Sequence, residues 1–146
     1  MERHWEQTRR DGERFSRRQI RLQGSEGSAH LWLNLLHAAA LDFILIRRVS
    51  GSTVGPDFGE GDNPTRDAFK TKADVVKFVQ EAIADGAQVI QQQGDAGLDK
   101  TSKFFGNRMA HNSAIWMFAI EHSAEHYGQL VVYYRANNLV PPDSRR

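Results

Sequence analysis

Two histidines, His122 and His126, stand four residues apart near the C-terminal end of the chain. On a helix, this spacing places both imidazoles on one face, one turn apart. Two such rings can bind one metal ion at about 2.0–2.1 Å each. Alone, the spacing favours an ordinary polar helix face, and it lacks the glutamate that follows the first histidine of a zincin motif. Glu121 and Glu125 flank the pair, either as partners of the ring N–H groups or as solvated side chains.

A third histidine, His37, lies in the most apolar part of the chain, next to Leu36 and close to Leu41. A neutral histidine buried there needs hydrogen-bond partners. Two interpretations stay open: bonding to a backbone carbonyl or to Asn34, or a ligand that faces His122 and His126. Helical bundles build metal sites from facing helices in this way. Three histidine ligands leave one to three positions for water or substrate, which is typical of catalytic sites.

The other chemistry-bearing residues point to no second kind of site. His4, His30 and His111 are interpreted as surface or rim residues, and a helix would place His111 about 16 Å from His122. The chain contains no cysteine, which excludes disulfides, thiolate ligands and a cysteine nucleophile. It also contains no nucleophile elbow, phosphate-binding loop or dinucleotide-binding motif. No general acid or base can be named.

The elements that must position these residues are predicted to be helices. Hydrophobic periodicity and capping signals predict four helical segments, at 2–22, 29–49, 71–93 and 108–137. Four helices without alternating strands predict an all-α four-helix bundle, and 146 residues predict a single domain, 1–146. Residues 24–28 are expected to form a turn, and Gly94 is expected to stop the third helix. Gly128, inside the last helix, predicts close approach of a neighbouring helix.

Two segments are atypical for a bundle. Residues 2–22 contain seven arginines and four acids with a thin apolar stripe, so the arginines are expected on a solvated face. Residues 51–70 contain five glycines and prolines before Pro64, which predicts a long surface loop or flexible lid. The acids of this loop are not at the spacing of a calcium-binding loop.

Composition argues against several classes of partner. The formal net charge is +1, which gives no bulk attraction to nucleic acid or to acidic lipid. The longest apolar run, residues 35–46, is shorter than the about 20 residues of a membrane span. Residues 1–10 lack the apolar region of a secretory signal. A soluble, cytoplasmic protein with no membrane partner is therefore expected.

Three stretches resemble proteins of the DinB/YfiT superfamily. Residues 119–142, which include both histidines of the pair, are similar to the last helix and tail of these proteins, and residues 35–43 are similar to their second helix. Residues 104–106 also fit the approach to the last helix. The resemblance covers residues 29–142 and is most specific from 115 to 142. Residues 1–28 depart from it because they are short and arginine-rich.

The resemblance implies a four-helix bundle, often a homodimer, with a divalent metal held by His37, His122 and His126. Some relatives are transferases or isomerases that use bacillithiol, mycothiol or glutathione. We therefore expect a metal-dependent transferase or hydrolase with a small-molecule substrate and a low-molecular-weight thiol cofactor. Zn, Ni and Fe all suit three imidazoles. The alternative is a non-catalytic, stress-associated dimeric bundle or binding module, in which the metal is structural or absent.

Overall fold

Three long helices dominate the computed structural model, which describes residues 24–145. The described part does not include the segment predicted as a helix at 2–22, nor His4, nor the side chain of His30. The elements are α2 (Gly24–Ser50), η1 (Arg66–Ala68), α3 (Lys72–Leu98), β1 (Thr101–Lys103), β2 (Met109–His111), α4 (Asn112–Ala136) and η2 (Pro142–Ser144). Among the described residues the architecture is mostly helical, as expected, with three α-helices and one small sheet.

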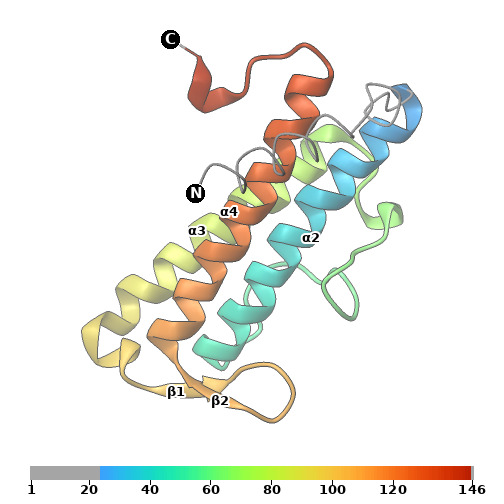
Figure 1. Cartoon of the computed structure of the whole chain (residues 1–146). Coiled ribbons are helices and arrows are strands. Elements are labelled where there is room, and N and C mark those ends of the chain that lie inside the picture. The colour runs from blue at the N-terminus through green and yellow to red at the C-terminus, as the bar shows by residue number, and fades with distance from the viewer. Residues whose placement is uncertain (1–23, 146) are drawn as a thin grey trace, which may run out of the picture.

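Helix α2 lies at the centre of the arrangement, because α3 and α4 both pack on it more closely than on each other. Figure 1 shows the three helices side by side, with α4 running back antiparallel to the other two. None of the helices in residues 24–145 combines the length and apolarity needed to cross a membrane. The packing of α4 on α2 is what brings the last helix of the chain to His37.

The start of α3 follows the sequence prediction. The Thr71 hydroxyl accepts a hydrogen bond from the backbone N–H of Asp74, and the Asp74 carboxylate accepts one from the N–H of Thr71. This reciprocal capping satisfies two backbone donors that a helix start leaves free. The predicted stop at Gly94 is confirmed as a break in the helix, and a further short helical stretch follows the kink and ends at Leu98. Gly94 has φ +58° and ψ −166°, which only glycine adopts readily.

Two helix boundaries differ from the prediction. Residues 24–28 form the first turns of α2 and not a separate turn. Helix α4 begins at Asn112 and not at residue 108, because Met109–His111 pair antiparallel with Thr101–Lys103. The buried Asn112 amide donates to the carbonyl of Gly97 at 2.8 Å, which ties the start of α4 to the end of α3. Strands of three residues are too short to show an alternating pattern.

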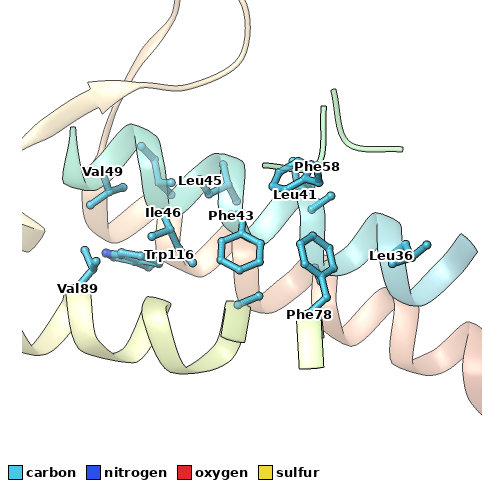
Figure 2. Close-up of a cluster of buried hydrophobic side chains, with 14 of the residues drawn as sticks. Leu36, Leu41, Phe43, Leu45, Ile46, Val49, Phe58, Phe78, Val89 and Trp116 are labelled. Carbon is cyan, nitrogen blue, oxygen red and sulfur yellow. The ribbon is translucent and has the colours of Figure 1, made fainter. Parts of the chain in front are cut away.

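The core is an aromatic cluster between α2, α3 and the loop that joins them. Figure 2 shows Phe43 of α2, Phe78 of α3 and Phe58 of the loop together, with ring centroids 5.0–5.9 Å apart. Phe58 and Phe69, both loop residues, are only 7% exposed. Burial of large aromatic side chains is among the strongest sources of stability in a small domain. The predicted flexible lid is therefore a loop anchored by its own aromatic residues.

Arg47 fixes the start of this loop. Its guanidinium donates to the carbonyls of Val54 and Pro56 at 2.8 and 2.6 Å, and it lies 4.6 Å from the centroid of the Phe58 ring. Gly55 has φ +77°, and a Cβ there would lie 2.1 Å from the Phe43 ring. The loop therefore passes too close to the core for any side chain at this position.

Among residues 24–145 no neighbouring helix approaches Gly128 as predicted, since a Cβ at this position would meet no atom of these residues within 4 Å outside the helix itself. Gly128→Ala is expected to raise the free energy of unfolding by about 1 kcal/mol, because alanine favours the helix interior. Gly55→Ala is expected to lower it by about 1–3 kcal/mol through overpacking. Urea unfolding followed by circular dichroism measures both. A destabilising Gly128→Ala substitution would mean that another surface covers this part of α4.

Candidate metal centre

Three histidines converge at the contact between α2 and α4. The Nε2 atom of His122 lies 3.2 Å from Nε2 of His37 and 3.0 Å from Nε2 of His126. The three ring centroids are 4.4–5.1 Å apart. The four-residue spacing brings His122 and His126 together on α4, and the packing of α2 against α4 adds His37 as the third ring. The predicted three residues are thus close enough together to hold one metal ion.

The separations of the nitrogens fit a shared ion. Two nitrogens that each lie 2.0–2.1 Å from one ion, at tetrahedral to octahedral angles, are about 2.8–3.4 Å apart. The two Nε2 separations, 3.0 and 3.2 Å, both fall in this range. Metals of this kind prefer imidazole nitrogen among their ligands. The donor set is therefore chemically and geometrically suited to a divalent transition metal.

The second nitrogen of His37 resolves the two interpretations left open by the sequence. Its Nδ1 lies 2.9 Å from the backbone carbonyl oxygen of Asp62, in the loop before α3. A carbonyl only accepts, so Nδ1 carries the hydrogen, and Nε2 of the neutral ring presents its lone pair to His122. His37 is therefore bonded to a backbone carbonyl and is also placed as a ligand. Asn34 is not its partner, since the Asn34 amide donates to Gln129.

Burial favours the neutral form of the other two rings. It lowers the pKa of His122, and the neighbouring imidazoles of His126 and His37 lower it further. Burial also lowers the pKa of His126, again with a contribution from His37. Neutral imidazole is the form that binds metal ions. The neighbouring imidazoles thus add to burial in favouring the neutral forms of His122 and His126.

The Nδ1 atoms of His122 and His126 are both buried, and neither has a hydrogen-bond partner at close range among residues 24–145. Glu121 and Glu125 are exposed, and the Glu125 carboxylate instead accepts a hydrogen bond from Gln129. Of the two roles left open for these acids, the solvated one is therefore observed. Within residues 24–145, His37 is the one ring of the three that has a second hydrogen bond to a backbone carbonyl, of the kind that orients most metal-binding histidines.

One side of the triad is apolar and another is accessible. The Phe118 ring stacks on His122 with 6.0 Å between centroids, and Phe104 and Phe105 pack against Phe118. The side chain of His37 is 24% exposed. An ion held by the three nitrogens would thus have aromatic cover on one side and remain within reach of small molecules.

His111 is an exposed residue, as predicted, but it lies in β2 and not on α4. Its Nδ1 lies 2.9 Å from the carbonyl oxygen of Asp99. It therefore contributes to the connection between α3 and α4 and not to the triad.

Sequence reasoning missed Asp42, which lies on α2 and contacts Ser123, the residue that follows His122 on α4. The Ser123 hydroxyl donates to Oδ2 of Asp42 at 3.4 Å, whereas Oδ1 of Asp42 is buried and has no partner in the part of the chain that the structure describes. Burial raises the pKa of Asp42 to about 6, and the bond from Ser123 opposes this shift. The signal in the sequence was an acid in the middle of an apolar helix.

Comparisons with known proteins add no relative: no family model matches the chain, and no curated protein or solved structure matches it either.

Asp42→Asn is expected to stabilise the fold at neutral pH. Between about pH 4 and pH 6 the unfolded chain releases a proton that folded Asp42 retains, so this residue lowers stability as the pH rises. The gain from the substitution is expected to grow from near zero at pH 4 to roughly 2–3 kcal/mol at pH 7.5. Urea unfolding at several pH values measures it, with the exposed Asp95→Asn as control. A gain independent of pH would contradict the interpretation.

Proposed function

We propose that this chain binds one divalent metal ion through Nε2 of His37, His122 and His126, and that it is a DinB-like protein. One observation carries the proposal: imidazoles from two helices converge, with one ligand atom of each ring within 4.8 Å of the others and with Nε2 separations of 3.0 and 3.2 Å from His122 to its two neighbours. Zn, Ni and Fe are the candidate ions. The hydrogen bond from His37 to the Asp62 carbonyl supports the same assignment, since it directs the free lone pair to the site.

The resemblance to the DinB/YfiT superfamily agrees with this site. The residues that resemble the last helix of that family form α4 and supply two ligands, and those that resemble its second helix supply His37. We extend the proposal to a cytoplasmic homodimer that acts on a small molecule. The single domain would then be a helical bundle with its reactive site at the contact between α2 and α4.

The reaction class proposed is thiol-dependent transfer or hydrolysis. A bound divalent ion would act as a Lewis acid that lowers the pKa of a bound water or thiol. Because the chain has no cysteine, the thiol must come from a low-molecular-weight cofactor. The chain's own contribution is to hold the ligands in place: the Asp62 carbonyl orients His37, and Phe118 excludes water from the side of His122.

A second candidate function is a non-catalytic, stress-associated bundle in which the metal is structural. The three ligands join two separate helices, so an ion bound there would cross-link α2 to α4. Binding to the folded state alone stabilises a protein in proportion to the logarithm of ligand concentration. In this case the ion would raise the melting temperature without supporting turnover.

Metal content tests the site directly. We expect the purified parent, loaded with Zn²⁺, Ni²⁺ or Fe²⁺ and desalted, to retain about one ion per chain by mass spectrometry. His37→Ala, His122→Ala and His126→Ala are each expected to lose it, because two imidazoles bind far more weakly than three. His111→Ala, an exposed histidine outside the triad, is the matched control and is expected to retain it. Equal metal content in parent and triad variants would reject the site.

Turnover separates the two candidate functions. The metal-loaded parent is incubated with glutathione, mycothiol or bacillithiol and 1-chloro-2,4-dinitrobenzene, where a C–S bond forms as chloride leaves. We expect a thiol-dependent rate that falls about 100-fold in His126→Ala. Loaded protein that gains thermal stability but gives no rate above that of His126→Ala, with these thiols and with activated esters, would favour the structural role.

A further inference from the structure

A cavity that opens to the surface lies on a different face of α4 from the histidines. It offers about 340 Å³ between α2, α3 and α4, and its lining includes Asp42 and Ser123. His122 and Ser123 are consecutive on a helix, so their side chains point about 100° apart, one to the triad and one to this cavity. Its volume is at the lower end of the range for small-molecule sites. The cavity is thus sized for one small ligand and is separate from the metal centre.

The walls of this cavity are apolar. Ile46 of α2 and Trp116 of α4, both labelled in Figure 2, are buried, whereas Ile83 and Ile120 are each 65% exposed. A Cβ at Gly86 would lie 3.4 Å from Ile46 and 3.9 Å from Trp116, so the glycine leaves space beside both. Covering exposed isoleucine surface contributes roughly 25 cal/mol per Å². The walls therefore favour a ligand with a compact apolar body.

One charged group lines this apolar space. Within residues 24–145 the Asp42 carboxylate has a single long hydrogen bond, from Ser123 to Oδ2, and its buried Oδ1 has none. Among residues 24–145 no lysine, arginine or histidine forms an ion pair with it. A buried carboxylate without a cation is costly, and a donor that carries positive charge is the partner that relieves most of that cost.

We propose that the cavity binds a small apolar ammonium ion, with the carboxylate of Asp42 as its counter-ion. Charge complementarity selects an ammonium over a carboxylate or a neutral alcohol. The apolar walls select an aryl or branched alkyl body over a polyamine. The Trp116 ring adds an aromatic surface, of the kind that cations contact favourably. This site shares no residue with the metal triad, so it does not depend on the proposed metal.

Titration of the full-length chain with 2-phenylethylamine tests the proposal, with 2-phenylethanol and 3-phenylpropionate as probes of the same shape. The indole N–H resonance of Trp116, assigned by its loss in Trp116→Phe, reports occupancy by NMR. We expect saturable binding of the amine, about tenfold tighter than that of the alcohol, because a hydrogen bond to a charged group exceeds a neutral one. The acid is expected not to bind.

Two variants make the test specific. Asp42→Asn is expected to remove the preference for the amine while leaving the alcohol's affinity within about twofold. Ala87→Leu places a larger side chain at the cavity lining on an exposed helix position, and is expected to abolish binding of both. Asp95→Asn controls for surface charge. Equal affinity for amine and alcohol, or amine binding unchanged in Asp42→Asn, would overturn the proposal. Failure of the amine to bind would also overturn the proposal, and this includes the case in which a second copy of the chain covers the cavity.

Discussion

Three neutral imidazoles can direct their Nε2 lone pairs to one point only if each ring carries its hydrogen on Nδ1. In this chain the N–H of His37 is committed to the Asp62 carbonyl, so its lone pair faces His122. That single hydrogen bond connects α2 to a loop residue 25 positions away. The convergence of the triad therefore depends on the loop as much as on the packing of α4.

The loop is positioned by the core. Phe58 packs against both Phe43 and Phe78, and Arg47 donates hydrogen bonds to two loop carbonyls while lying over the Phe58 ring. These contacts fix the segment that then delivers the carbonyl of Asp62 to His37. Aromatic packing several residues away thus sets the orientation of a candidate metal ligand. A second-shell partner of this kind affects affinity without touching the metal.

What the sequence could predict followed from periodicity within single helices. The four-residue spacing places His122 and His126 together on any helix, and the capping pair Thr71 and Asp74 marks where α3 begins. The hairpin before α4 was missed because its strands have three residues each. The Asp62 carbonyl was missed because a backbone group leaves no trace in residue type. The cavity at Asp42 arises only from how three helices pack, which no local pattern records.

Several buried polar atoms lack a hydrogen-bond partner among residues 24–145, and four of them belong to residues of the two proposed sites. They are Nδ1 of His122 and of His126 in the triad, and Oδ1 of Asp42 and Nε1 of Trp116 in residues that line the cavity. Each such atom costs about 1–3 kcal/mol when nothing binds it. Proteins retain destabilising groups chiefly where function uses them. The unpaired Oδ1 of Asp42, on α2, is therefore an argument for the proposed ammonium site, whereas the argument for the proposed metal centre is the separation of the Nε2 atoms.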